Sequence, residues 1–271
     1  MVRAWYTGAS GMRAQQFRLD TVANNLANVD VNGYKKDTSI HKSFPELLMR
    51  RMQDDGMYQH PFGSGDAAPI IGKLGLGVEY NETYTQFEQG PLKQTDANVD
   101  MALDGQGFFA IGTPYGERYT RNGAFQIGKE GILETKEGYP VLGENGILHI
   151  DDNDFTVDKE GRVWITPMQD ETADATLLDS LKLVEFGNER YLQKQGSSFY
   201  RDTDVSGPAM IIAQGERPRV EQGFIEGSNV NPVLEMVQMI EVNRAYEANQ
   251  KVIQTTDAMA GRLINEVTRL A

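Results

Sequence analysis

Apolar side chains recur at helical spacing at both ends of this chain. Near the C-terminus they alternate by three and four positions, the a/d pattern of a helix that packs lengthwise against other helices. We call these residues the C-terminal row: Met239, Val242, Tyr246, Asn249, Ile253, Thr256, Ala260, Leu263, Val267 and Leu270. The first residues of the chain repeat this spacing in an N-terminal row: Val2, Trp5, Ala9, Met12, Gln16, Leu19, Ala23 and Leu26. The pattern predicts two long terminal helices that pair as a coiled coil and then assemble with other copies.

The C-terminal helix has a clear start signal, because Asn231 can cap it and Pro232 fits its first turn. Burying half of the apolar side chains in the C-terminal row would contribute on the order of 10 kcal/mol. A second apolar row lies beside the first: Val237, Ala245, Ala248, Val252 and Met259. The apolar face is therefore wider than one partner helix needs. The polar row positions either are tolerated mismatches or fix register and partner number; they are Gln16, Asn249 and Thr256.

The first helix is predicted from about Arg3 to Asn28, where an Asn-rich run followed by Gly33 favours a stop and a turn. The stretch 40–72 is predicted to hold a short helical fragment, Phe44 to Met52, and then a long mobile connection.

From Gly75 the pattern changes to period two, which predicts strands separated by turns that contain Asn and Gly. An extended strand is expected over 78–87, and shorter ones over 99–103, 107–111, 118–120, 124–127, 132–134, 140–142, 147–150, 181–186, 210–213 and 220–225. An internal repeat relates Phe125–Leu133 to Phe155–Val163, each copy running through Lys-Glu-Gly. We interpret it as one hairpin type used twice.

Composition places the chain among soluble globular proteins, with 39% hydrophobic and 24% charged residues. The net charge of −13 lies mostly in residues 61–216, which hold 12 Lys and Arg against 26 Asp and Glu. Since binding to nucleic acid requires clustered Lys and Arg, this acidic middle argues against a nucleic-acid partner. No run of about 18 apolar residues occurs, so we expect no membrane insertion. The first residues lack the apolar stretch of a cleavable signal peptide, and we expect none.

The sequence offers little for catalysis or metal binding. It has no cysteine, which excludes disulfides and thiolate metal sites. Its histidines, His41, His60 and His149, share no short spacing, so no metal site is predicted. Nucleophile-elbow, dinucleotide-binding and phosphate-loop motifs are absent from the sequence. We therefore expect no catalytic residue and no cofactor.

Several segments together resemble the rod and hook proteins of the bacterial flagellum. They follow the family's order along essentially the whole chain: Ala23-Asn-Asn-Leu-Ala-Asn-Val29, Gly33-Tyr-Lys35, Leu103-Asp-Gly-Gln-Gly-Phe-Phe109, Tyr119-Thr-Arg-Asn-Gly123, Glu226-Gly-Ser-Asn-Val-Asn231, Met239-Ile240 and Arg244-Ala-Tyr-Glu247. Within the family, 138–146 and Gly227 look more like the proximal rod type (FlgF), and the distal rod type (FlgG) is the alternative. Hook protein is less similar because its middle is usually larger.

The resemblance implies an α+β fold in three parts. Residues 1–36 and 228–271 would form the helical coiled-coil domain, 37–95 and 206–227 a β-rich connecting segment, and 96–205 an outer all-β domain. Such proteins polymerise helically with their own copies and with neighbouring rod proteins. They leave the cell interior through the flagellar type III export apparatus and form the basal-body rod that crosses the periplasm. No enzymatic activity is implied.

Two other classes of function remain open from the residues. The acidic middle and its aromatics, such as Tyr115, Tyr119 and Trp164, are compatible with a domain that binds or cleaves glycans. The paired terminal helices are also compatible with a secreted adhesin.

Overall fold

The computed structural model describes residues 2–50, 58–60, 63–65, 70–150, 154–166, 175–196 and 198–270. The chain divides into two compact units, which we describe separately. Unit 1 contains Met1–Val22, Ser39–Thr83 and Val237–Ala271, and unit 2 contains Ala23–Thr38 and Tyr84–Met236. The secondary structure is two terminal helices and a β-rich remainder, as an α+β fold requires. Among the helices of the described residues, none is both long and apolar enough to cross a membrane.

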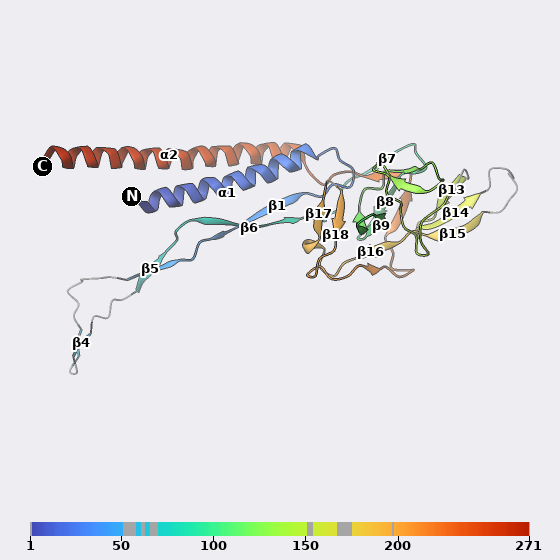
Figure 1. Cartoon of the computed structure of the whole chain (residues 1–271), viewed down its shortest axis with the longest axis horizontal. Helices are drawn as coiled ribbons and strands as arrows, with labels where there is room; N and C mark the ends of the chain where they lie inside the picture. Colours follow the sequence, from blue (N-terminus) through green and yellow to red (C-terminus); the bar gives the residue numbers. More distant parts are fainter. Residues whose placement is uncertain are drawn as a thin grey trace. The chain divides into compact units, whose positions relative to one another are not determined.

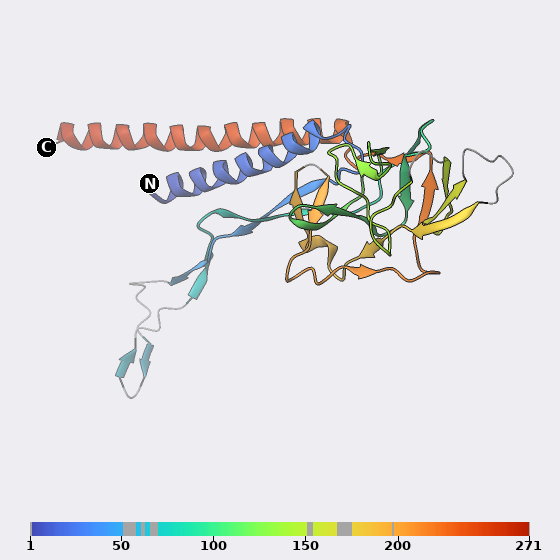
Figure 2. The same cartoon turned by 45° about the vertical axis from the view of Figure 1, so that its right-hand side comes forward.

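Both terminal helices form as the hydrophobic pattern predicts. Helix α1 spans Val2–Ala27 and α2 spans Pro232–Leu270. The Asn231 side chain caps α2, because its Oδ1 accepts hydrogen bonds from the backbone N–H groups of Val233 (3.1 Å) and Leu234 (3.3 Å). The parts of the two helices that belong to unit 1 run side by side (Figures 1 and 2).

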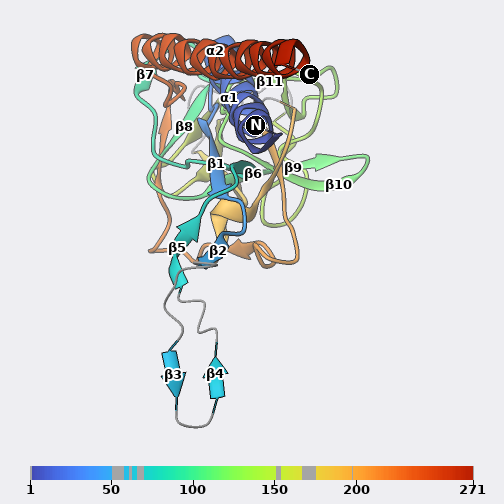
Figure 3. The same ribbon diagram turned by 90° about the vertical axis from the view of Figure 1, so that its left-hand side faces the viewer.

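The described strands between Asp37 and Thr85 form two-stranded ribbons (Figure 3). The pairs are β1 (Asp37–Ser43) with β6 (Val78–Thr85), β2 (Leu47–Arg50) with β5 (Ile70–Leu74), and β3 (Tyr58–His60) with β4 (Gly63–Gly65). The predicted strand over 78–87 is thus confirmed. The predicted helical fragment is wrong over 44–50, because Leu47 to Arg50 pair with β5 instead. Arg51 and Met52 lie outside the described residues.

Unit 2 is built around a six-stranded sheet in the order β17-β18-β10-β9-β16-β19. Its strands are β9 (Phe108–Thr113), β10 (Gly116–Thr120), β16 (Leu183–Glu185), β17 (Gln193–Gln195), β18 (Phe199–Arg201) and β19 (Met210–Ile211), and the short helix η1 (Glu189–Tyr191) precedes β17. The flanking pairs are β7 (Leu92–Gln94) with β21 (Phe224–Glu226), and β8 (Met101–Asp104) with β20 (Arg219–Gln222). The predicted strands over 140–142 and 147–150 appear as isolated bridges.

The predicted repeat is confirmed as two hairpins. Strand β11 (Phe125–Ile127) pairs antiparallel with β12 (Leu133–Thr135), and β13 (Asp154–Val157) pairs antiparallel with β14 (Arg162–Thr166), to which β15 (Thr176–Ser180) adds a third strand. Each hairpin turns at a glycine with positive φ, Gly131 at 69° and Gly161 at 77°. Lys-Glu-Gly therefore recurs because the third position of the turn needs a backbone that glycine adopts without strain.

Strand β9 separates two apolar cores, because successive side chains of a strand point to opposite faces. Phe109 and Ile111 belong to the larger core, and Phe108 and Ala110 belong to the smaller one. All four side chains are fully buried. Unit 2 thus buries apolar side chains on both faces of its central strand.

Candidate functional site

The two helices of unit 1 lie close together at two glycines of α1. A Cβ atom on Gly8 would lie 2.9 Å from Ile253 Cγ1, and one on Gly11 would lie 3.0 Å from Asn249 Nδ2. Glycine within a helix costs roughly 0.8–1.0 kcal/mol relative to alanine, so its presence here is explained by the close approach of α2. Ile253 and Asn249 belong to the C-terminal row. On α1, however, Gly8 and Gly11 lie outside the N-terminal row.

The C-terminal row follows the least exposed face of α2. Val242 is buried and Tyr246 and Leu263 are exposed, while the row's other described members are partly buried: Met239, Asn249, Ile253, Thr256 and Ala260. In the N-terminal row, Gln16, Ala9 and Ala23 are exposed, and the partly buried members are Trp5, Met12, Leu19 and Leu26. The side chains of Val2, Val267 and Leu270 lie outside the described residues. Whether the rows are assembly interfaces stays a prediction.

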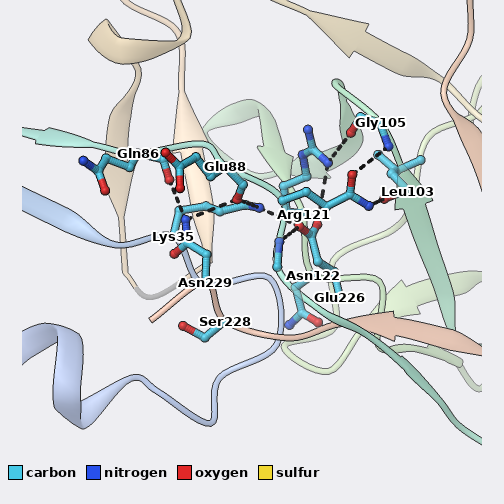
Figure 4. A network of polar contacts seen from close by, with 12 residues as sticks. Lys35, Gln86, Glu88, Leu103, Gly105, Arg121, Asn122, Glu226, Ser228 and Asn229 are labelled. Carbon is cyan, nitrogen blue, oxygen red and sulfur yellow. Dashed lines mark hydrogen bonds and ion pairs between the residues drawn. The ribbon is translucent and has the colours of Figure 1, made fainter. Parts of the chain in front are cut away.

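A buried ionic cluster lies within unit 2 (Figure 4). Lys35 Nζ is 2.5 Å from Glu226 Oε1, and Arg121 Nη1 is 3.6 Å from Glu226 Oε2. All three side chains are almost completely buried. A buried charge requires a partner of opposite sign and further hydrogen bonds, and this cluster has both.

Backbone groups supply further hydrogen bonds to the cluster, whereas Arg121 Nε and Glu226 Oε2 have no hydrogen-bond partner within the described part of the chain. Lys35 Nζ donates to Glu88 O (2.7 Å), and Arg121 Nη1 donates to Gly105 O (2.8 Å). The backbone N–H of Gly90 donates to Glu226 Oε1 (2.8 Å). The cluster thus fastens five separate segments of the chain to one another.

Burial governs the protonation of this cluster. It lowers the pKa of Lys35 and of Arg121, and the nearby Glu226 carboxylate opposes both shifts. Burial raises the pKa of Glu189, against the influence of Arg121 and Lys35. The pairing therefore offsets a large desolvation cost, and removal of one charge leaves the others uncompensated.

A second set of polar contacts in unit 2 joins the end of α1 to the start of α2. Tyr34 Oη donates to Asn24 Oδ1 (2.9 Å), and Asn25 Nδ2 donates to Asp37 O (2.9 Å) and lies 3.4 Å from Glu235 Oε2. Two ion pairs extend this network, Lys36 Nζ with Glu235 Oε1 (2.5 Å) and Lys194 Nζ with Asp37 Oδ2 (3.0 Å). The backbone N–H of Lys36 also donates a hydrogen bond to Asn229 Oδ1 (2.7 Å). Residues distant in sequence therefore hold the two helix ends of this unit in register.

The network explains why the resembling motifs contain the residues they do. Gly33 has φ +67°, and a Cβ there would collide with the backbone N of Asn122, so only glycine fits. Lys35, Arg121 and Glu226 each stand in a different motif and meet in one cluster. Pattern reasoning missed this cluster because periodicity predicts elements and faces, whereas these contacts are between segments up to 191 residues apart.

Within the described ranges, no three His, Asp or Glu side chains gather closely enough to hold a metal ion. Of the aromatics considered for a glycan site, Tyr119 is buried and Tyr115 is exposed. Tyr119 contacts Phe186 edge-to-face with ring centroids 4.9 Å apart, which is a core contact.

Three family models match successive parts of the chain. They describe a flagella basal body rod protein (residues 6–35), a flagellar hook protein FlgE/F/G D1 domain (residues 102–165) and a flagellar basal body rod FlgEFG protein C-terminal region (residues 221–266). Together they cover most of α1, much of the β-rich middle and most of α2.

Full-length relatives have the same assignment. The chain is 37% identical over 267 residues to the flagellar basal-body rod protein FlgG of Borreliella burgdorferi, covering 96% of this chain and 97% of the relative. It is 33% identical to the FlgG protein of Bacillus subtilis (98% and 99% covered) and 31% identical to the FlgF protein of Caulobacter vibrioides (100% of both). The chain belongs to the flagellar basal-body rod protein family.

Proposed function

We propose that this rod-family chain is a structural axial subunit that polymerises helically through its terminal helices. The polymer would enclose an export channel and transmit torque, with no chemistry of its own. The observation that carries the proposal is the exposed apolar surface of α2 in unit 1, which includes Val252, Met259, Leu263 and Ile264. Surface of this kind is costly in water and is typical of a protein–protein interface.

The finer architecture belongs to the same proposal. The close approach of α1 and α2 at Gly8 and Gly11 supports a coiled-coil pairing of the terminal helices. The two apolar cores of unit 2 support an outer β-domain that folds by itself. We keep the division into a helical domain (1–36 and 228–271), a connecting segment (37–95 and 206–227) and an outer domain (96–205).

Of the two rod types, we propose the distal one. Seven relatives named FlgG align with 33–37% identity over 95–98% of the chain, and the FlgF relative aligns with 31% identity. The proximal type is the second candidate, because the FlgF alignment covers the whole chain and the motif over 138–146 resembles that type. Localising a tagged chain along isolated basal bodies separates the two types.

The proposed partners are further copies of this chain, neighbouring rod proteins and the flagellar type III export apparatus. The proposed location is the rod where it crosses the periplasm. The net charge of −13 supports this proposal, because free copies of like charge repel one another. Such copies would stay in solution until they meet their partners during assembly.

The test of the proposed function is deletion of residues 252–271. Incorporation into basal bodies should be lost, because the deletion removes the exposed apolar residues Val252, Met259, Leu263 and Ile264 of α2. The denaturant-induced unfolding transition of unit 2 should be unchanged, because its cores contain no residue of that segment. Normal incorporation of the truncated chain would contradict the proposal.

A further inference from the structure

Unit 1 contains an apolar groove along α1. The groove has a volume of about 500 Å³ and lies between α1 and the residues around the start of β6. Its lining includes Tyr6, Ser10, Arg13, Phe17, Val78 and Tyr80. Most of this lining is apolar, so the groove is suited to an apolar ridge with few charges.

The groove lies on the side of α1 that faces away from α2. Gly8 and Gly11 contact α2, and the groove residues Ser10 and Arg13 each follow one of these glycines by two positions. Two positions correspond to about 200° around a helix of 3.6 residues per turn. The α2 helix of the same copy is therefore engaged on another side of α1, and an occupant of the groove would have to be another segment.

The walls of the groove are held in place by specific contacts. The rings of Phe17 and Tyr80 stack with centroids 4.6 Å apart. Thr7 Oγ1 donates to Leu76 O (3.2 Å), and the backbone N–H of Val78 donates to Ser10 Oγ (3.3 Å). The groove is thus formed before any occupant binds, which lowers the entropic cost of binding.

The same chain carries a ridge of matching chemistry. On α2, Val252, Met259 and Leu263 are exposed and follow one another by seven and four positions, which places them on one helix face. Glu266 follows Leu263 by three positions and continues this face with a carboxylate. The ridge therefore ends in a single negative charge.

The groove contains a cation that suits this carboxylate. The Arg13 guanidinium lies 5.7 Å from the centroid of the Phe17 ring, and no ion pair joins it to a carboxylate of the described residues. The lining also contains Glu79, whose carboxylate pairs with Lys42 (3.8 Å). Arg13 is the one basic residue in the lining, so an apolar ridge ending in a carboxylate fits the walls and this guanidinium.

We propose that the groove of one copy receives the ridge Val252, Met259, Leu263 and Glu266 of a second copy, with Glu266 pairing with Arg13. This inference rests on the proposed polymerisation and specifies which surfaces meet. It differs from the pairing of α1 with α2 inside a copy, because it uses the opposite face of α1 and a stripe of α2 that shares only Leu263 with the C-terminal row.

Site-directed cross-linking tests the contact. Because the chain has no cysteine, any disulfide within or between its copies must form between introduced cysteines. Two differently tagged full-length chains are expressed together, one with Val78→Cys and one with Met259→Cys. The host is a normally flagellated strain from which the native gene has been deleted. Basal bodies are isolated and oxidised. We expect a covalent band that carries both tags, which only a contact between copies can produce.

The matched control replaces Val78→Cys by Tyr115→Cys, an exposed position in unit 2, and should give no such band. If both tagged chains enter basal bodies and the two-tag band is missing, the groove assignment is overturned and the proposed function stands. If the unaltered tagged chain does not enter basal bodies at all, both are overturned.

A charge exchange tests the same contact without cysteine. Arg13→Glu and Glu266→Arg should each lower incorporation about twofold to fivefold, the effect of losing one exposed ion pair. The double variant should recover incorporation, because the pair is restored with reversed sign. Additive losses in the double variant would overturn the pairing.

Discussion

Units 1 and 2 bury apolar side chains to very different extents. In unit 2, both faces of β9 are covered and a Lys–Glu–Arg cluster is enclosed together with its hydrogen-bond partners. In unit 1, α2 between residues 237 and 266 has one buried residue, Val242, and its exposed residues include Val252, Met259, Leu263 and Ile264.

The difference in burial indicates that the two units are stabilised in different ways. Unit 2 buries enough apolar surface to offset the entropy of ordering its chain. Unit 1 leaves so much of α2 uncovered that we expect the exposed part of α2, which does not line the groove on α1, to order fully only with partner copies. Substitutions in unit 2 should therefore act on folding of a single copy, whereas substitutions on α2 should act on assembly.

The largest effect is expected from Glu226→Gln in unit 2. The change leaves Lys35 and Arg121 buried without a negative partner, and breaking a buried pair typically costs 3–5 kcal/mol. The free energy of unfolding, measured by urea denaturation of the full chain, reports this loss.

The matched control for that prediction is Glu117→Gln, whose partner Lys182 is 2.7 Å away in a solvent-accessible pair. Exposed pairs contribute about 0.2–1 kcal/mol, so the control should change little. Equal effects of the two substitutions would show that the buried cluster does not hold unit 2 together.

A smaller but selective effect is expected from Leu263→Asp on α2. Leu263 is 51% exposed, so a charge there should leave the unfolding free energy of unit 2 unchanged. It should prevent incorporation into basal bodies, because assembly would have to desolvate the carboxylate. Incorporation is read by immunoblotting of isolated basal bodies.

Leu177→Asp in β15 is the matched control, since Leu177 is 52% exposed. It should enter basal bodies normally if the outer β-domain is not part of the axial contact. If both variants assemble equally well, exposure of apolar side chains on α2 is unrelated to assembly.

A third prediction compares two helical glycines of unit 1. Gly261→Ala on α2 points into open space and should stabilise the helix by about 0.8–1.0 kcal/mol. Gly8→Ala should gain less or lose stability, because its Cβ would lie 2.9 Å from Ile253 Cγ1. Helical content of the full chain by circular dichroism checks the pair, and equal gains would contradict the close approach of α1 and α2.

Periodicity predicted the elements of the chain better than their contacts. Both helices, the strand β6 and the two related hairpins follow from the pattern, because each depends on a local spacing. The stretch from Phe44 onward was misassigned as helix, since a short apolar run does not distinguish helix from strand without its partner.

The candidate site was less predictable for the same reason. The C-terminal row identified Asn249 and Ile253, but these residues lie close to Gly8 and Gly11 of α1, which no hydrophobic pattern selects. A hydrophobic residue gives no indication of which small residue it meets. The sequence signal for this contact was the presence of glycines inside the predicted helix. Glycine destabilises a helix relative to alanine, so its presence there indicates a close approach of another segment.

An effect confined to alkaline pH is expected at Tyr119 in the smaller core of unit 2. Burial, together with the nearby carboxylates Asp202 and Glu117, raises the pKa of Tyr119 from 10.0 to about 12. The folded state therefore favours the neutral phenol. This contribution to stability is fully present below pH 10 and is lost as the pH rises from 10 to 12.

Tyr119→Phe should remove that part of the pH dependence, so the variant should lose less unfolding free energy than the native chain between pH 10 and 12. Tyr115→Phe is the control at an exposed position and should follow the native chain. If Tyr119→Phe changes the pH at which unit 2 unfolds, alkaline unfolding begins in the core of unit 2. If the profile is the same for all three proteins, the phenol of Tyr119 does not control the alkaline stability of unit 2, and the alkaline limit must be set elsewhere in the chain.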